Sequence, residues 1–202
     1  MAEQHQALSL EEWAGSQNLG LTLVFTDIVD STRMGIKLGD TNWIEDLFQH
    51  FSMARIIGGM YDSYVVKAIG DSLMMAFRRP SEAVQFAVNF STNTGVDYIG
   101  IRVGIHSGEV EIRENDVYGL NVNLASRVQH AIPGEGNLST ESIKRDYERR
   151  LGTDSGVRFI PRKVDLKSFG QETLYFVVTP ELRQARVSHL QARSTLLPIT
   201  AK

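Results

Sequence analysis

The sequence contains no cysteine, which excludes disulfide bonds and thiolate chemistry. It also has no run near the roughly 18 apolar residues that suggest a membrane-spanning helix. The first residues are acidic and polar, whereas a secretory signal peptide needs a basic start followed by an apolar stretch. These absences fit a reducing compartment, and we expect a cytoplasmic protein that has no membrane partner.

A large excess of charge of one sign is missing too. The chain has 21 lysines and arginines against 24 acidic residues, a formal net charge of −3, so we expect no nucleic-acid partner. The basic residues between Arg145 and Lys163 are spread over a predicted helix and a predicted strand, which is typical of a solvated face. The five histidines lack the spacing of metal ligands, and we interpret His106 as structural.

The length and composition favour one globular domain. A chain of 202 residues with 42% hydrophobic residues can bury a core, whereas two domains would each be small. We divide the chain into a polar N-terminal flank (1–18), a compact body (19–179) and a C-terminal tail (180–202). The flank has room for a short helix from Leu8 to Trp13, and the tail predicts a weak helix at best.

Within the body, apolar residues alternate between strand-like and helix-like spacing. Residues 19–28 predict a buried strand, and a helix begins near Asp40 and ends near Gly58. Strands on either side of Gly70–Asp71 predict a hairpin, and residues 119–130 predict an amphipathic helix. The order of elements predicts an α+β fold: one largely antiparallel sheet with helices packed on one face. The predicted inner face of the first long helix is Ile44, Leu47, Phe48, Phe51 and Ile57.

Two acids meet at one end of this predicted sheet. Asp27 ends the first strand, and Asp71 lies on the turn of the hairpin. If the strands are neighbours, the two carboxylates repel each other unless cations lie between them. Oxygen ligands with room for phosphates suit Mg²⁺. A structural alternative is that Asp71 serves the turn and Asp27 leads into a helix cap at Ser31.

Several segments around these acids resemble the class III nucleotidyl cyclases, which include adenylate and guanylate cyclases. The segments are LVFTDIVDST, VVKAIGDSLMMAF, IRVGIHSGEV, DVYGLNVNLASRV and LKSFGQETLYFV, and they occur in the order of the family. The resemblance covers nearly the whole body, 19–179, as a nucleotidyl cyclase catalytic domain. It implies a ferredoxin-like palm that works as a head-to-tail homodimer, in which each active site takes metal ligands from one subunit and nucleotide-reading residues from the other.

The resemblance also implies residue roles at the acids. Asp27 and Asp71 match the metal-binding acids, and the backbone carbonyl of Ile28 is a further ligand, so that two Mg²⁺ or Mn²⁺ ions bind in each site. The backbone amides of Ser31 and Thr32, at a predicted helix start, are candidates to hold phosphates.

Lys67 and Asp116 match the pair that reads the base. Adenine presents an acceptor at N1 and donors at its N6 amine, and guanine reverses this pattern. Lysine only donates hydrogen bonds and an ionised aspartate only accepts them, so the pair complements adenine and favours ATP over GTP. In isolation, a solvated lysine and an ordinary loop acid would explain the same two residues.

Asn123 and Arg127 match the residues that orient the ribose and stabilise the transition state. They are four apart, so they share a helix face, and each follows a predicted core leucine (Leu120, Leu124) by three positions. The planar guanidinium of arginine suits an anionic phosphoryl group. Lys167 matches the lysine that holds the terminal phosphates.

These roles predict an adenylate cyclase. The ribose 3′-oxygen attacks the α-phosphorus of ATP in line and expels pyrophosphate, with two metal ions in attendance. Two alternatives remain open: a cyclase that uses GTP or several bases, and a catalytically silent nucleotide-binding or regulatory domain. Asp30 stands where many family members have glycine, and it either weakens triphosphate binding or points outward.

Overall fold

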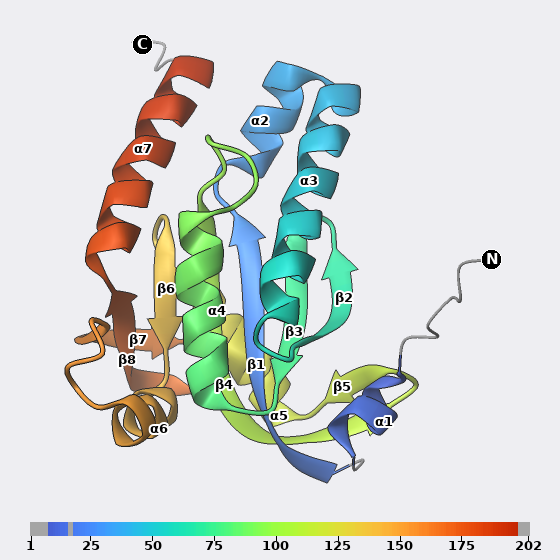
Figure 1. The fold of residues 1–202 in the computed structure, drawn as a ribbon, viewed down its shortest axis with the longest axis vertical. Coiled ribbons are helices and arrows are strands. Elements are labelled where there is room, and N and C mark those ends of the chain that lie inside the picture. Colours follow the sequence, from blue (N-terminus) through green and yellow to red (C-terminus); the bar gives the residue numbers. More distant parts are fainter. Residues whose placement is uncertain (1–7, 16–17, 198–202) are drawn as a thin grey trace.

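The computed structural model describes residues 8–15 and 18–197. Residues 1–7 of the predicted flank and 198–202 of the predicted tail lie outside the described residues. The elements are shown in Figure 1 and are, in chain order, α1 (Leu10–Ala14), β1 (Asn18–Ile28), α2 (Ser31–Leu38), α3 (Asp40–Gly59), β2 (Tyr64–Ile69), β3 (Ser72–Phe77), α4 (Pro80–Thr92), β4 (Ile101–Arg113), β5 (Asp116–Tyr118), α5 (Leu120–His130), β6 (Gly136–Ser139), α6 (Glu141–Leu151), β7 (Arg158–Leu166), β8 (Gly170–Val178) and α7 (Pro180–Leu196).

One sheet runs through the molecule in the order β2-β3-β1-β4-β6-β8-β7, and the short β5 pairs with β4. Every pairing is antiparallel except that of β4 with β6. Strand β1 lies in the interior of the sheet and pairs with β4 along its whole length. The predicted α+β class and mostly antiparallel sheet are therefore confirmed.

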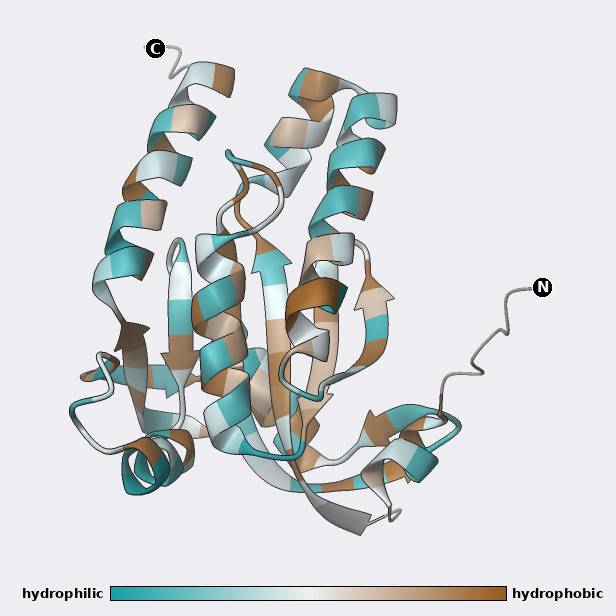
Figure 2. Cartoon of the chain, in the orientation of Figure 1, coloured by the Kyte–Doolittle hydropathy of each residue, from teal (hydrophilic) through white to brown (hydrophobic). Residues whose placement is uncertain are grey.

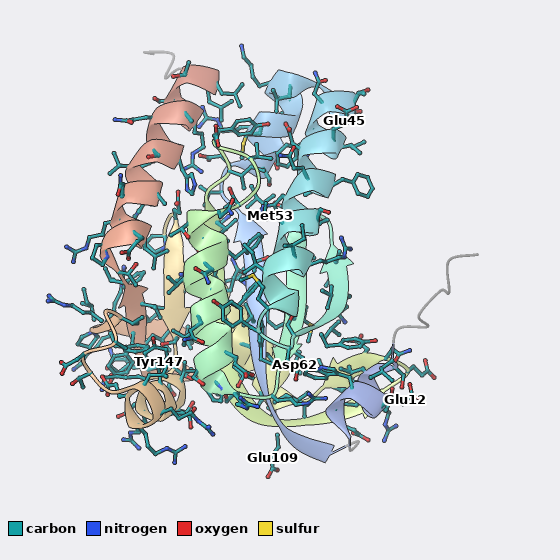
Figure 3. The ribbon with its side chains drawn as sticks, viewed as in Figure 1. Glu12, Glu45, Met53, Asp62, Glu109 and Tyr147 are labelled. Atoms are coloured by element: carbon teal, nitrogen blue, oxygen red, sulfur yellow. The ribbon has the colours of Figure 1, made fainter. Side chains whose placement is uncertain are left out.

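Helices α3, α4 and α6 pack on one face of the sheet and form the larger apolar core. Figure 2 shows apolar residues along the inner side of α4 and on the strands beneath it, and Tyr147 of α6 lies at the lower end of this layer (Figure 3). Alternate residues of β1 point to opposite faces, so Val24 belongs to this core whereas Leu21 and Leu23 belong to a second one. That second core packs against α1 and α5. The sheet therefore carries helices on both faces, whereas the sequence predicted them on one face only.

The predicted inner face of α3 is only partly correct. Phe51 and Ile57 are buried, but the Ile44 and Phe48 side chains are 48% and 69% exposed. All the buried residues of α3 lie in its second half, because its first turns rise beyond the end of β1, next to α2 (Figure 1). The apolar spacing of α3 therefore continues through its first turns, although no strand of the described residues lies beneath them.

The tail forms a longer and more regular helix than the weak one that the sequence predicts. Helix α7 has 17 residues, and the Thr179 side chain caps its start by accepting a hydrogen bond from the Leu182 N–H. Its buried residues are His189 and Arg193, so an apolar period does not reveal it. Among the residues described, no helix has the length and apolar character needed to cross a bilayer.

Candidate active site

Asp27 and Asp71 lie at the same end of two neighbouring strands. The register of β1 and β3 pairs Thr26 with Leu73, which places Asp27 opposite Ser72. The Ser72 Oγ donates a hydrogen bond to Asp27 Oδ1 at 3.1 Å, and Asp71 precedes Ser72 in the turn between β2 and β3. The structure thus brings the two predicted metal acids to one place, which we call the acid edge (Asp27, Asp71 and Ser72).

Arg102 is a further member of this site, and the sequence alone did not single it out. It lies directly across from Asp27 in the β1–β4 register, and its Nη2 is 2.5 Å from Asp27 Oδ2. The two side chains are 30% and 22% exposed, so the ion pair is partly shielded from water. Aligning the strands around Asp27 and Arg102 as antiparallel neighbours would have found this pair. The sequence alone does not determine which residues of two strands lie opposite each other.

The donor set at the acid edge suits a hard divalent cation. Within residues 8–15 and 18–197, no cluster of three or more histidine or acidic side chains has metal-binding geometry. A cation there would rest on two carboxylates and main-chain oxygens, which suits Mg²⁺ because it keeps waters and binds substrate phosphates. The Ile28 side chain is buried in the larger core, so this residue has only its carbonyl to offer. The Arg102–Asp27 pair shows that the edge already accommodates positive charge.

The main chain after the acid edge turns sharply into α2. Asp30 has a φ of 62°, a left-handed conformation that glycine adopts freely and aspartate tolerates. Its side chain is exposed and makes no capping hydrogen bond, so of the two readings of this acid the structure favours the outward one. Ser31 and Thr32 are the first residues of α2, where backbone N–H groups lack intrahelical partners and are available to an anion.

Lys67 and Asp116 come from β2 and β5 and meet in an ion pair. The Lys67 Nζ is 2.5 Å from Asp116 Oδ2, and Asp116 Oδ1 accepts a hydrogen bond from the Val117 N–H at 2.8 Å. A register shift between Val65 and Lys67 sets Lys67 opposite Met74, and Met74 belongs to the core of the α1 and α5 face. The two residues predicted to read the base are therefore adjacent, partly exposed and fixed in orientation.

Helix α5 carries Asn123, which is exposed, and Arg127, which is half-buried. The prediction that Leu120 belongs to the core is wrong, because its side chain is 75% exposed. The helix is instead held by later residues such as Val128 and, at its start, by the polar side chain of Asn121.

His106 on β4 provides that polar contact. Its Nε2 lies 3.0 Å from Asn121 Oδ1, and its Nδ1 lies 3.0 Å from the Thr140 hydroxyl. The Asn121 Nδ2 donates to the Glu109 carbonyl, which leaves Oδ1 as an acceptor and places a proton on His106 Nε2. Burial lowers the pKa of His106, against a smaller opposing effect of its bond to Asn121. This geometry agrees with the structural role expected for His106.

The acid edge and the start of α5 are far apart in one chain. A side chain at Gly108 would collide with Asn121, so α5 begins directly over Gly108. Gly108 pairs with Leu21, six residues before Asp27 on β1, which corresponds to about 20 Å along a strand. Lys167 is exposed in the turn between β7 and β8, at the opposite edge of the sheet from β2. One chain thus presents the predicted residues in separate groups.

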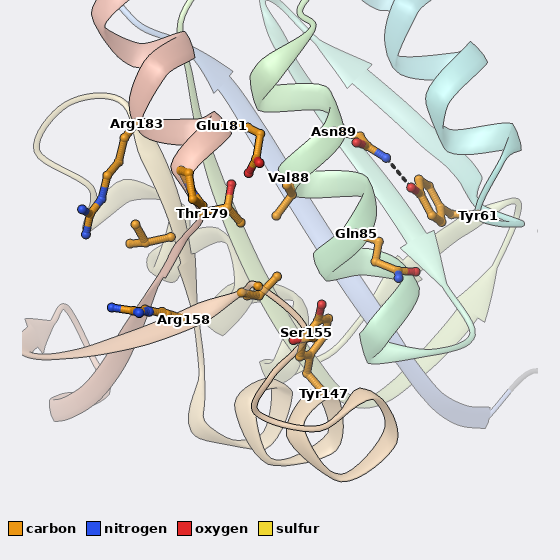
Figure 4. A pocket seen from close by; sticks show the side chains of 14 residues that line it. Tyr61, Gln85, Val88, Asn89, Tyr147, Ser155, Arg158, Thr179, Glu181 and Arg183 are labelled. Carbon is orange, nitrogen blue, oxygen red and sulfur yellow. Dashed lines mark hydrogen bonds between the residues drawn. The ribbon is translucent and has the colours of Figure 1, made fainter.

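A cavity of about 860 Å³ opens elsewhere, between α4, α6 and the start of α7 (Figure 4). Tyr61, Asn89, Tyr147 and Thr179 are among the residues that line it, and the Asn89 side chain donates a hydrogen bond to the Tyr61 hydroxyl. None of the predicted site residues lines this cavity. The predicted residues instead come from β1, α2, β2, the β2–β3 turn, β5, α5 and the β7–β8 turn.

Known proteins match most of the length of this chain. The family model described as the adenylate and guanylate cyclase catalytic domain matches residues 16–178. A receptor-type adenylate cyclase of Trypanosoma brucei brucei is 25% identical over 202 aligned positions, which cover 72% of this chain and 16% of that protein. An adenylate cyclase of Streptomyces griseus is 28% identical over 127 positions, covering 62% of this chain and 32% of that protein. The chain therefore spans only a minor part of these relatives.

Solved structures show the same fold. A structure of adenylate cyclases from Trypanosoma brucei in their monomeric state superposes with a TM-score of 0.71 at 24% identity, covering 79% of this chain and 88% of that one. The adenylyl cyclase CyaB from P. aeruginosa superposes with a TM-score of 0.69 at 19% identity, covering 80% and 95%. By its family match and its fold, this chain belongs to the adenylate and guanylate cyclase catalytic domain family.

Proposed function

We propose that this chain is an adenylate cyclase that converts ATP to 3′,5′-cyclic AMP and pyrophosphate. The observation that carries this choice of base is the pairing of Lys67 with Asp116 on an accessible face. Lysine supplies a donor for adenine N1, and aspartate supplies an acceptor for the N6 amine. With guanine both contacts would be mismatched, because O6 accepts and N1–H donates. The curated relatives described above, which are named adenylate cyclases, support the same choice.

In the proposed reaction, the ribose 3′-oxygen forms a bond to the α-phosphorus while the bond to the pyrophosphate oxygen breaks. Asp27, Asp71 and the Ile28 carbonyl would hold two Mg²⁺ or Mn²⁺ ions, which would supply acidification of the 3′-hydroxyl and positive charge for the triphosphate. The amides of Ser31 and Thr32 receive phosphate oxygens at the start of α2.

The remaining residues act by position and charge. Asn123 orients the ribose, and Arg127 stabilises the negative charge that develops on the α-phosphoryl group. Lys167 binds the terminal phosphates. Arg102 neutralises Asp27 in the structure, and its guanidinium would be available to the triphosphate if cations occupied the acid edge.

We further propose that the active site is shared between two copies of the chain. Asn123 lies near the start of α5, which is about 20 Å along β1 from Asp27, whereas the end of α5 packs on Gly104, opposite Phe25. We infer from this separation that Asn123 and the acid edge of one chain serve different nucleotides. A head-to-tail homodimer would place the acid edge of one copy against α5 of the other. Two shared sites per dimer follow from its twofold symmetry.

Mixing two inactive variants tests the function and the sharing together. Asp27→Asn removes an acid from one half of the site, and Arg127→Ala removes the guanidinium from the other. Each variant alone should lose at least about 10²-fold in cyclic AMP formation. After random exchange of subunits, about one quarter of the sites are intact, because half of the dimers are mixed and each has one good site. Mixtures that exchange subunits but stay inactive would exclude sharing.

The base preference is tested with all four nucleoside triphosphates. Lys67→Glu combined with Asp116→Cys should lower kcat/KM for ATP by about 10²-fold or more and favour GTP. Lys144→Glu with Glu148→Cys is a matched control, since it alters a similar ion pair on α6. An unaltered preference for ATP would show that Lys67 and Asp116 do not read the base. If the unmodified protein binds ATP but yields no cyclic product from any triphosphate, the chain is a silent member of the family.

A further inference from the structure

Three ionisable side chains are almost completely buried where α7 meets the sheet. Glu135, between α5 and β6, is 7% exposed, and His189 and Arg193 of α7 are each 5% exposed. The His189 Nδ1 donates to Glu135 Oε1 at 2.7 Å, and the Arg193 Nη2 donates to Glu135 Oε2 at 3.2 Å. Both carboxylate oxygens are thus held by one helix. We call Glu135, His189 and Arg193 the α7 anchor.

This anchor is an unusual way to dock a helix. An amphipathic helix normally turns its apolar stripe to the core, yet α7 buries His189 and Arg193 while Val187 and Leu190 are exposed. Buried ion pairs stabilise a fold poorly compared with apolar residues of similar size, because desolvation offsets most of their attraction. Helix α7 also lies beyond the matched range 16–178. Stability alone therefore does not account for the anchor.

The anchor touches the strand beside the acid edge. A side chain at Gly100 would collide with Glu135 Oε2 and come within 3.1 Å of Arg193 Nη1, so Gly100 is pressed directly against the ionic group. The Gly100 carbonyl accepts a hydrogen bond from the Val29 N–H at 2.9 Å. Val29 follows Ile28 and Asp27, so one contact and one hydrogen bond separate the anchor from the main chain of the acid edge.

We propose that the α7 anchor positions the acid edge. By packing Glu135 against Gly100, it holds the Gly100–Val29 hydrogen bond, and this bond fixes the main chain that presents Asp27 and the Ile28 carbonyl to divalent cations. His189 and Arg193 are positioning residues that act through Glu135. The cation part of this inference rests on the proposed function, whereas the coupling of α7 to Val29 does not. Displacing α7 would therefore lower the affinity for the cations without touching the residues that read the base.

Amide hydrogen exchange in the whole chain, without nucleotide or metal, tests the coupling. Arg193→Met leaves Glu135 with one partner, and exchange at Val29 should become about tenfold faster or more. Arg193→Lys keeps the charge and should restore most of the protection. Arg186→Met is the matched control, because Arg186 is an exposed arginine of the same helix. Unaltered protection of Val29 in Arg193→Met would overturn the proposal.

A second control separates positioning from general destabilisation. Ser91→Ala removes a buried hydrogen bond to Asn137 in the same region without touching Gly100. After the change in the global free energy of unfolding is subtracted, the Val29 amide should exchange more slowly in Ser91→Ala than in Arg193→Met. Equal acceleration in the two variants would show that the effect is not specific to the anchor.

Catalysis gives an independent readout. In Arg193→Met the Mn²⁺ concentration that gives half-maximal cyclic AMP formation should rise about tenfold, while the ratio of ATP to GTP use stays unchanged. A changed base ratio with an unchanged Mn²⁺ requirement would overturn the positioning of the acid edge. If the unmodified protein forms no cyclic AMP, the proposed function fails, and the exchange at Val29 still decides whether α7 is coupled to the acid edge.

Discussion

Helix α1 is held to the body by apolar and aromatic side chains, whereas α7 is held by a buried ionic group together with Leu196, which packs against the larger core. Leu10 and Trp13 of α1 are buried, the Trp13 and Tyr64 rings lie 5.6 Å apart, and the Arg78 guanidinium lies 4.7 Å from the centre of the Trp13 ring. Both flanking helices fall outside the range 16–178 that matches the family. The same body thus carries two additions that are attached by different physical forces.

The two helices also adjoin different parts of the candidate site. The Leu10 N–H donates to the Asn115 side chain at 2.8 Å, and Asn115 precedes Asp116 of the proposed base-reading pair. The α7 anchor instead contacts Gly100 beside the acid edge. Apolar contacts form wherever surface can be buried, whereas a buried ionic group requires all its partners in place. The second kind of anchor is therefore the one that responds sharply when a partner is lost.

The largest predicted effect is the loss of a single ionic partner. Arg193→Met should lower the free energy of unfolding by roughly 4 kcal/mol, because Glu135 remains buried without its guanidinium. Adding Glu135→Met should recover most of this loss, since the mismatched charge is then gone. Urea unfolding of the two variants measures both values. If the double variant is no more stable than Arg193→Met, the cost lies in packing and the contrast with α1 weakens.

The pH dependence of stability that arises in the core is distinct from any effect of the α7 anchor. His50 of α3 is buried beside Phe90, and burial lowers its pKa from 6.5 to about 4, although its bond to the Thr94 carbonyl and the charge of Asp71 oppose the shift. As the pH falls, the unfolded chain takes up a proton near 6.5 and the folded chain only near 4. Stability should therefore fall between these values, by about 3 kcal/mol in total.

Most of this pH effect should belong to His50, whose pKa is lowered to about 4, although burial lowers the pKa of His106 as well. In His50→Gln, the free energies of unfolding in urea at pH 7 and pH 4.5 should differ by about 2 kcal/mol less than in the unmodified protein. Arg193→Met should keep the full pH dependence. A pH dependence that disappears with Arg193 rather than with His50 would mean that the ionic anchor, not the core, senses protons.

Loss of the apolar contacts of α1 should lower the free energy of unfolding by less than loss of an ionic partner in the α7 anchor. Trp13→Ala should cost about 2 kcal/mol, below the value for a central core tryptophan, because α1 is short and opens locally. Leu8→Ala is the control, since Leu8 is exposed on the same flank and its truncation should change stability little. Equal losses in the two variants would show that α1 is not anchored through the Trp13 ring.

The sequence predicted those parts of the fold that have a local pattern. The apolar run that ends at Asp27, the Gly70–Asp71 hairpin and the bounds of α3 near Asp40 and Gly58 all follow from spacing and turn residues. The motifs also singled out Lys67 and its partner Asp116, and the two side chains are in contact. Their roles in binding remain predictions.

The rest depended on contacts between distant segments. Arg102 is found only when β4 is set in register with β1. Helix α7 was predicted only as a weak helix, because its buried residues are His189 and Arg193 and a search for apolar spacing does not detect them. At Phe48 the apolar spacing of α3 predicted burial, but the side chain is exposed because this part of the helix extends beyond the sheet.

The smallest predicted effect compares the caps of the two helices. The Ser9 and Thr179 hydroxyls each accept a hydrogen bond at 3.2 Å from the backbone N–H of the residue three positions on. Replacing either by alanine should destabilise the helix that it caps by about 1 kcal/mol. In α1 the cap is reciprocal, because the Glu12 side chain also accepts from the Ser9 N–H.

The two caps should differ in where that loss is felt. Ser9→Ala removes much of the support of a five-residue helix, so amide exchange at Trp13 should accelerate while urea unfolding changes little. Thr179→Ala weakens a 17-residue helix whose buried anchor lies in its second half, so that helix should loosen at its start while Val29 stays protected. Faster exchange at Val29 in Thr179→Ala would show that the whole of α7, and not only its ionic group, supports the acid edge.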